Sequence, residues 1–146
     1  MRIVFAGIVA VFLGQAAFAQ TCEDIAGQFF NSIREEKTAE GSARAWATNP
    51  YAAGMKDSID QFTTKLTSNL SFLGKYRGNE LVVKKEVAGR FVYLYYFVVF
   101  DRQPMKFEVQ CYKPVDKWVL HNLQFSDKIT SDVVDAASRD LFRGGE

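Results

Sequence analysis

The run from Phe91 to Phe100, FVYLYYFVVF, constrains the fold of this chain more than any other segment. It contains no charged residue, glycine or proline. Its valines and aromatic residues favour a strand over a buried helix, because branched and aromatic side chains pack well on a pleated surface. At about 3.3 Å per residue, such a strand would span roughly 30 Å. The run therefore predicts a long central strand.

The segments that follow predict an antiparallel meander. Asp101 to Pro104 is a turn signal, and residues 105–112 then alternate apolar with mostly polar side chains. A second turn, at 114–117, precedes a third run from Trp118 to Phe125. Alternation with a period of two places one face of a strand in a core. Short turns join neighbouring antiparallel strands, so these three segments predict three consecutive strands of one sheet.

The central strand needs cover on both faces, because alternation divides it into two apolar sets. The first set is Phe91, Tyr93, Tyr95, Phe97 and Val99, and the second set is Val92, Leu94, Tyr96, Val98 and Phe100. Helices of the same chain would cover one set. Large exposed apolar patches are unusual on monomers. We therefore expect a second copy of the chain to cover the other set, which gives a homodimer through the sheet face.

Two helices are predicted before the sheet and one after it. Apolar residues recur every fourth position in Cys22–Glu36, where acidic residues occupy the first turn and suit the helix dipole. Tyr51–Leu70 carries one continuous apolar stripe. Thr130–Phe142 predicts a short C-terminal helix. Helices followed by a run of strands indicate an α+β fold, with N-terminal helices packed on a curved antiparallel sheet.

The remaining segments are read less directly. Lys37–Asn49 shows no clear pattern, because Gly41-Ser42 interrupts it. Residues 71–87 predict a hairpin that opens the sheet, turning at Arg77-Gly78-Asn79. No repeat or linker divides the chain. We therefore expect a single domain over residues 20–146.

The first 19 residues have the features of a secretory signal peptide. Arg2 is the basic residue, Ile3–Leu13 is the apolar segment, and Ala17-Phe18-Ala19 is a small-x-small cleavage motif. Cleavage would fall between Ala19 and Gln20. The apolar run is too short for a membrane anchor, and the mature chain contains no second apolar segment of spanning type. We expect an exported protein, periplasmic or secreted.

Cys22 and Cys111 are the two cysteines of the chain. In an oxidising compartment they could form a disulfide that ties the first helix to the sheet. Alternatively, Cys111 is a buried free thiol on the core face of its strand. A metal site is not expected, because two cysteines and a distant histidine show no ligand spacing. Nor does the sequence predict a cofactor, since it has no phosphate-binding loop or nucleotide-binding glycine pattern.

Composition argues against some partners. The formal charge is +1, and the leader carries one charged residue, Arg2. The mature chain would therefore be close to neutral. A chain without a basic patch is not expected to bind nucleic acid or an anionic membrane surface.

Three features of the element order are distinctive. They are Phe72-Leu73-Gly74 leading into Tyr76, the aromatic strand Phe91–Phe100, and the strand-turn-strand segment YKPVDKWVLHNLQF, which ends at Phe125. Together they resemble the NTF2-like superfamily, also called cystatin-like or SnoaL-like. The resemblance covers Cys22–Lys128 and consists of spacing and residue class.

The resemblance implies a cone of helices and curved sheet around an apolar pocket, with dimers often formed through the outer sheet face. Domains of this kind include isomerases, dehydratases, polyketide cyclases, ligand carriers and assembly modules. The resemblance thus implies the fold more specifically than the function.

Enzymes of this superfamily place an Asp or His inside the cone, where burial tunes its pKa. The acids and the histidine to consider are Asp60, Asp101, Glu108 and His121. None matches a catalytic motif of the family, so no catalytic residue is assigned. Asp60 follows Ile59 on the second helix, and alternation places His121 on the same strand face as Leu123.

The candidates for lining a pocket are Tyr76, Tyr93, Tyr95, Asp60 and His121. Buried tyrosine hydroxyls need partners, which a ligand can supply. Alternatively, the tyrosines are core or dimer-interface residues.

These patterns favour a binding or accessory module for a small apolar or amphipathic ligand, or for a partner protein. The alternatives are an enzyme of isomerase, dehydratase or cyclase type, and a purely structural dimerisation domain. They differ in whether Asp60, Glu108 or His121 faces an open cavity.

Overall fold

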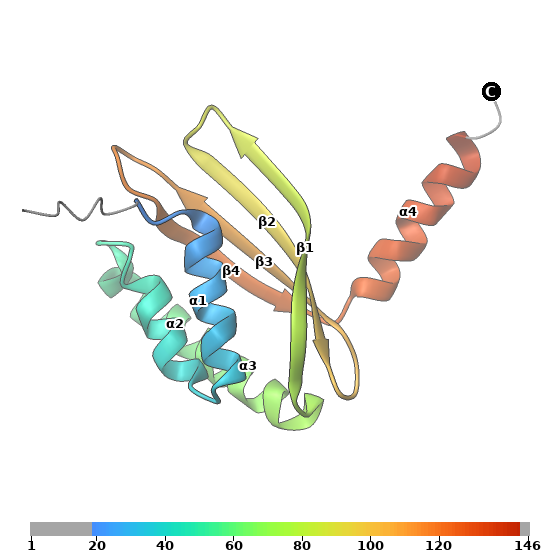
Figure 1. Cartoon of the computed structure of the whole chain (residues 1–146), viewed down its shortest axis with the longest axis horizontal. Coiled ribbons are helices and arrows are strands. Elements are labelled where there is room, and N and C mark those ends of the chain that lie inside the picture. The colour runs from blue at the N-terminus through green and yellow to red at the C-terminus, as the bar shows by residue number, and fades with distance from the viewer. Residues whose placement is uncertain (1–18, 144–146) are drawn as a thin grey trace, which may run out of the picture.

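The computed structural model describes residues 19–143 and confirms an α+β fold, in which three N-terminal helices pack on a four-stranded antiparallel sheet and a fourth helix follows (Figure 1). The predicted signal peptide falls on residues 1–18, outside the described residues. The elements are α1 (Cys22–Arg34), α2 (Thr38–Trp46), the 3₁₀ helix η1 (Ala52–Met55), α3 (Lys56–Leu73), β1 (Tyr76–Val87), β2 (Phe91–Phe100), β3 (Met105–Tyr112), β4 (Val119–Ser126) and α4 (Ile129–Arg143).

The sheet is the predicted meander, with strand order β1-β2-β3-β4 and antiparallel pairing throughout. The helices α1, α2 and α3 lie over one of its faces (Figure 1). The two predicted sets of β2 side chains lie on opposite faces. The set that begins with Val92 faces the helices, and its members are no more than 6% exposed. The other set is half-buried or exposed on the outer face.

Aromatic rings fill the space between the helices and the sheet. Phe30 of α1 packs edge-on against Tyr96 of β2 and against Phe107 of β3, with ring centroids 4.9 and 5.5 Å apart. Phe107 stacks on Phe125 of β4 at 5.8 Å, and Phe125 in turn meets Phe62 of α3 at 5.5 Å. This chain of rings connects α1 to α3 through two strands, so the interior of the domain is filled by its own side chains.

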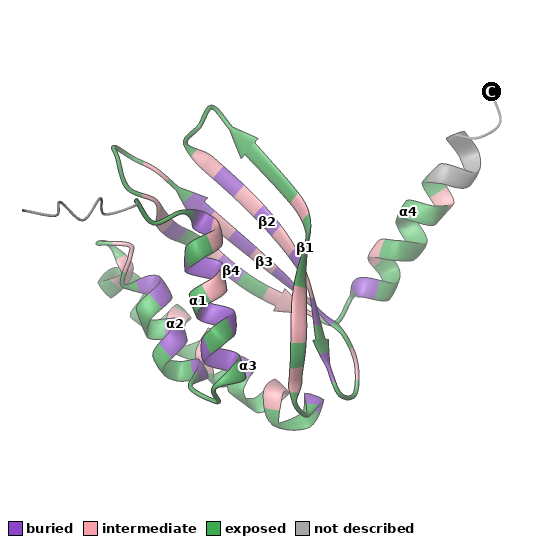
Figure 2. Ribbon diagram, viewed as in Figure 1, coloured by how far each residue is buried: buried purple, intermediate pink, exposed green. Residues whose placement is uncertain are grey.

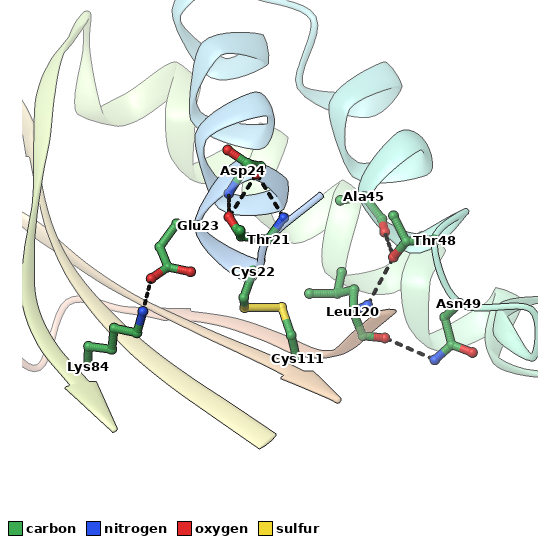
Figure 3. Close-up of a disulfide and its surroundings, with 10 residues drawn as sticks. All are labelled: Thr21, Cys22, Glu23, Asp24, Ala45, Thr48, Asn49, Lys84, Cys111 and Leu120. Carbon is green, nitrogen blue, oxygen red and sulfur yellow. Dashed lines mark hydrogen bonds and ion pairs between the residues drawn. A yellow bond between two sulfur atoms is a disulfide. The ribbon is translucent and has the colours of Figure 1, made fainter. Parts of the chain in front are cut away.

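A disulfide joins Cys22, the first residue of α1, to Cys111 of β3 (Figure 3). Their Cα atoms are 5.7 Å apart, and both residues are buried. Thr21 caps the helix at the same place, accepting a hydrogen bond from the backbone N–H of Asp24 while the Asp24 carboxylate accepts one from the Thr21 N–H. The beginning of α1 is therefore fixed both covalently and by its cap.

Two further contacts surround the disulfide (Figure 3). Glu23 of α1 forms an ion pair with Lys84 of β1. On the other side, the loop after α2 covers the edge strand β4. There the Leu120 N–H donates to Thr48 Oγ1 at 2.9 Å, and the Leu120 carbonyl accepts from Asn49 Nδ2 at 2.9 Å. These bonds satisfy backbone groups that an edge strand would otherwise leave unpaired.

The segment Lys37–Asn49, which showed no pattern in the sequence, contains α2. Its small residues are the reason that it packs closely on α1. A Cβ atom on Gly41 would lie 1.7 Å from Ser32 Oγ, so the two helices touch where Gly41 lacks a side chain. Buried small residues carry little hydrophobic periodicity, which explains why the helix was not evident from apolar spacing.

The predicted hairpin over residues 71–87 is wrong. Helix α3 continues to Leu73, and a single strand, β1, begins at Tyr76. Gly74 makes the change of direction with a φ of +81°, in a region that favours glycine. The Arg77-Gly78-Asn79 sequence that indicated a turn lies instead within β1, beside a register shift between Tyr76 and Gly78.

Helices α1, α2 and α3 leave the outer face of the sheet uncovered (Figure 2). Helix α4 points away from the rest of the domain (Figure 1) and is attached through its first turn. Ile129 there is buried, and Asp132 bonds to Lys106 Nζ at 2.8 Å. Val133 and Val134, by contrast, are 60% and 55% exposed. Among residues 19–143, no helix is both long and apolar enough to cross a membrane.

The double substitution Cys22→Ala/Cys111→Ala tests the contribution of the disulfide. The disulfide closes a loop with a sequence separation of 89 residues. We expect loss of the disulfide to lower the free energy of unfolding by about 2–5 kcal/mol, chiefly because the unfolded chain regains conformational entropy. Urea unfolding of both proteins without reductant measures the difference. Wild-type protein unfolded and refolded with reductant serves as the control and should match the variant. Equal stability of the oxidised wild type and the variant would contradict the anchoring role.

Candidate functional site

A cavity of about 500 Å³ opens where α1 and α3 end and β1 begins. We call it the helix-end pocket. Its lining comes from five elements, the loop between α1 and α2, and the turn between α3 and β1. The lining residues are Ile33, Arg34, Glu36, Thr38, Thr67, Leu70, Ser71, Gly74, Lys75, Tyr76 and Phe100. Its size is within the usual range for small-molecule sites.

The apolar wall of the pocket is continuous with the core. Ile33 and Phe100 are 5% and 4% exposed, and Leu70 of α3 is half-buried and packs against the core. Ile33 is at the end of the apolar stripe of α1, and Phe100 is the last residue of β2 on the face covered by helices. The helix-end pocket is therefore an opening at the end of the domain.

Tyr76 lies between this apolar wall and the polar rim of the pocket, which carries Arg34, Glu36 and Lys75. Its ring meets Phe100 edge-on at a centroid distance of 5.9 Å, and the Arg34 guanidinium lies over it, 5.5 Å from the centroid. Its hydroxyl accepts a hydrogen bond from Asn79 Nδ2. These three contacts hold the ring in one orientation at the mouth of the pocket.

Asp101, in the turn after β2, positions the rim. Its Oδ2 accepts a hydrogen bond from the Lys75 backbone N–H at 3.0 Å, and its Oδ1 accepts one from Arg77 Nε at 2.6 Å. The Asp101 N–H donates back to the Lys75 carbonyl at 3.1 Å. A Cβ on Gly74 would come within 2.9 Å of the Asp101 Cβ, so the backbone approaches this close only because residue 74 is glycine.

The same contacts change the acidity of Asp101. The Lys75 backbone N–H, and next the Arg77 guanidinium, lower the pKa of this carboxyl below its ordinary value. The ionised form of Asp101 is thus the one that fastens residues 75–77 to the turn after β2.

The candidates predicted from sequence are not brought together. Tyr76 lines the helix-end pocket. Asp60 is exposed on α3, where it pairs with Lys56, and it lies outside the pocket lining. Tyr93 and Tyr95 are on the outer face of the sheet, which none of α1, α2 and α3 covers.

On that outer face, Tyr93 donates a hydrogen bond to Glu108 Oε1 at 2.6 Å. Burial, and next the hydrogen bond to Glu108, raise the pKa of Tyr93 above its ordinary value. The Lys106 ammonium lies 5.7 Å from the centre of the Tyr95 ring. Glu108 is therefore occupied by Tyr93 and by Lys106, whose Nζ is 3.8 Å from Glu108 Oε2.

Alternation predicted that His121 shares a strand face with Leu123, and this prediction is wrong. A register shift in β4 opposes Gln110 to Asn122 and Cys111 to Leu120, which leaves His121 as the extra residue of a β-bulge. Leu120 and Leu123 both face the core, while His121 is exposed. Its ring meets that of Phe91 on the outer face at 5.9 Å.

Sequence reasoning missed most of the helix-end pocket. Arg34 and Glu36 belong to a charged run that is typical of a solvated helix end, and Lys75 follows α3 without any motif. The signal available in hindsight is their position. Arg34 is at the end of α1 and Lys75 follows the end of α3, just before β1. The two residues are far apart in the sequence, and only the fold brings these helix ends to one pocket.

Within residues 19–143, no cluster of three or more His, Cys, Asp or Glu side chains is arranged to hold a metal ion. Comparisons with known protein families, curated protein sequences and solved structures find no match to this chain. The site must therefore be interpreted from its own geometry.

The pKa of Asp101 gives a pH-dependent test. A carboxyl whose pKa is lowered by folding stabilises the fold at neutral pH, and this contribution is lost as the pH falls through its folded-state pKa. We expect Asp101→Asn to be less stable than wild type at pH 7, with the difference narrowing as the pH falls below about 4. Urea midpoints at several pH values measure it.

The control for this test is Asp116→Asn, in the exposed turn between β3 and β4, which forms no ion pair among the described residues. It should leave the midpoints close to those of wild type at every pH. A stability difference for Asp101→Asn that does not change with pH would contradict the assigned role.

Proposed function

We propose that this protein is an exported ligand-binding module of NTF2-like type, which holds a small amphipathic or apolar molecule in the helix-end pocket. The observation that carries the proposal is the cavity of about 500 Å³ that joins a buried apolar wall to a charged rim. Small-molecule sites combine apolar walls with placed polar groups, and the lining of this cavity is about evenly divided between the two. The order of helices and meander strands is compatible with the NTF2-like arrangement.

Export is supported by two observations. The leader has the charge, apolar segment and cleavage motif of a signal peptide. The disulfide between Cys22 and Cys111 is of a kind that persists in oxidising compartments. We therefore place the protein in the periplasm or outside the cell.

Catalysis has less support than binding. Asp60, Glu108 and His121 lie outside the helix-end pocket, and the acid that lines it, Glu36, is exposed. General acid–base catalysis needs a titratable group within reach of the substrate, with a pKa tuned by its surroundings. An isomerase, dehydratase or cyclase mechanism would thus depend on a residue that this pocket does not desolvate.

We also propose that the chain forms a homodimer through the outer face of the sheet. The supporting observation is the aromatic row Phe91, Tyr93, Tyr95 and Phe97 of β2, which none of α1, α2 and α3 covers. Val87 of β1 and Tyr112 of β3 flank it and are 61% and 44% exposed. A row of aromatic side chains without a covering helix is typical of an interaction surface.

Blocking the pocket tests the binding proposal. Thr67 is an exposed residue of α3 that lines the pocket, and a tryptophan there would occupy the cavity while leaving the core unchanged. We expect the neutral fluorescent probe N-phenylnaphthylamine to bind wild type, and Thr67→Trp to weaken it at least about tenfold, a loss of about 1.4 kcal/mol. Fluorescence titration measures both affinities.

The matched control is Thr64→Trp, one turn earlier on α3 and outside the pocket lining. It should bind the probe as wild type does. Equal weakening by both variants, or no binding to wild type, would refute the pocket as the site.

The dimer proposal is tested at Val99, a β2 residue that is 38% exposed on the outer face. Native mass spectrometry of the mature protein should show a dimer. Val99→Lys should shift it towards monomer, because burying a lysine at an interface is costly. Val115→Lys, at a 79% exposed turn position, is the control and should remain dimeric. A wild-type monomer at all accessible concentrations would contradict the dimer.

A further inference from the structure

The charges around the helix-end pocket indicate the kind of ligand it binds. We infer that the ligand is an amphipathic anion whose carboxylate is held by Arg34 and Lys75, while its apolar part lies against Ile33, Leu70, Tyr76 and Phe100. This inference rests on the proposed binding function and specifies its ligand class. It follows from the donors that remain free at the rim.

Arg34 has most of its donors available. Its Nη1 lies 3.3 Å from Asn31 Oδ1, and it forms no ion pair among the described residues. The guanidinium has five N–H donors in a planar fork that matches a carboxylate. Its stacking on Tyr76 places that fork next to the apolar wall. A ligand whose apolar part contacts Tyr76 would therefore bring a negatively charged end group within reach of the Arg34 guanidinium.

Lys75 supplies a second positive charge on the same rim. Its backbone is fixed on both sides by Asp101, yet its ammonium forms no ion pair within the described part of the chain. Asp101 does not neutralise it fully, because Oδ1 of that carboxylate is bonded to Arg77 and Oδ2 to the Lys75 N–H. The backbone that carries this cation is thus fixed, and no carboxylate among the described residues forms an ion pair with its ammonium.

The helix ends around the pocket also bear on ligand charge. Two helices end there, and helix C-termini are partly negative, so the cations could simply offset them. However, backbone donors already satisfy carbonyls at those ends. Glu36 N–H donates to Ile33 at the end of α1, and Arg102 N–H donates to Leu73 at the end of α3.

The third helix end at the pocket is positive. Thr38, the first residue of α2, is 7% exposed and lines the cavity, and the preceding Lys37 provides no side-chain cap. The first N–H groups of a helix without such a cap favour an anion nearby. The positive end of α2 therefore adds to the attraction of Arg34 and Lys75 for an anion.

Glu36 is the acid in the lining, so positive side chains outnumber negative ones by one. A ligand with a single negative charge and an apolar body matches this balance. Glu36 also disfavours a ligand with several negative charges, because like charges repel at short range. The pocket is therefore suited to a carboxylate with a hydrocarbon or aromatic chain.

The experiment compares ligands that share an alkyl chain and differ in the head group. Octanoate, octanol and octylammonium each compete with N-phenylnaphthylamine for wild-type protein at neutral pH and low salt. We expect octanoate to compete about tenfold better than octanol, the scale of a charge-assisted contact, and octylammonium to be the weakest. The preference for octanoate should fall as salt is added, since salt screens exposed charges.

The double variant Arg34→Met/Lys75→Met assigns the effect to these residues. Both side chains are exposed, so the fold should persist, and methionine retains apolar length. It should lose the preference, so that octanoate and octanol compete equally well with the probe. Arg44→Met, at an exposed arginine of α2 outside the pocket lining, is the matched control and should keep the preference.

The outcomes separate the inference from the function on which it rests. If octanol competes as well as octanoate, or octylammonium competes better, the anion inference is overturned while ligand binding stands. The same holds if the double variant keeps the full preference. If neither the probe nor any of the three ligands binds wild-type protein, the proposed function itself fails.

Discussion

The attachment of α1 to the sheet is the constraint on which the rest of this structure depends. The disulfide fixes its first residue to β3, and Phe30 inserts between Tyr96 and Phe107 in the following turns. A covalent bond placed beside an aromatic cluster limits both the position and the tilt of the helix. Because α2 packs on α1 through Gly41, the second helix inherits this position.

The location of the helix-end pocket follows from this arrangement. Aromatic rings occupy the middle of the domain, and the helix-end pocket lies where the helical layer ends. At that end the hydrogen bonds from Lys75 and Arg77 to the Asp101 carboxylate hold the start of β1 in place. The pocket thus has a rigid rim on the sheet side and helix ends on the other. A site built from fixed backbone is able to select ligands by head-group charge, as we propose.

The sequence predicted the parts of the fold that rest on strong periodicity. The two faces of β2, the meander and the stripe of α3 are all encoded in alternating or helical apolar spacing. Helix α2 could not be found in this way, because its buried residues other than Trp46 are small or polar, such as Gly41 and Ser42, and give no apolar spacing. His121 was misplaced by one bulge, since an extra residue reverses alternation beyond it. The pocket depended on bringing Arg34 and Lys75 together, which spacing along the chain does not reveal.

The most direct test of this account is an NMR titration of isotope-labelled, oxidised protein with N-phenylnaphthylamine. Backbone amide shifts should concentrate at the helix-end pocket, at Arg34, Thr38, Leu70, Lys75 and Tyr76. Amides of the outer face, such as those of Tyr93 and His121, should remain unchanged. Shifts centred on the outer face of the sheet, with the pocket amides unmoved, would contradict the claim that this protein binds its ligand at the helix ends.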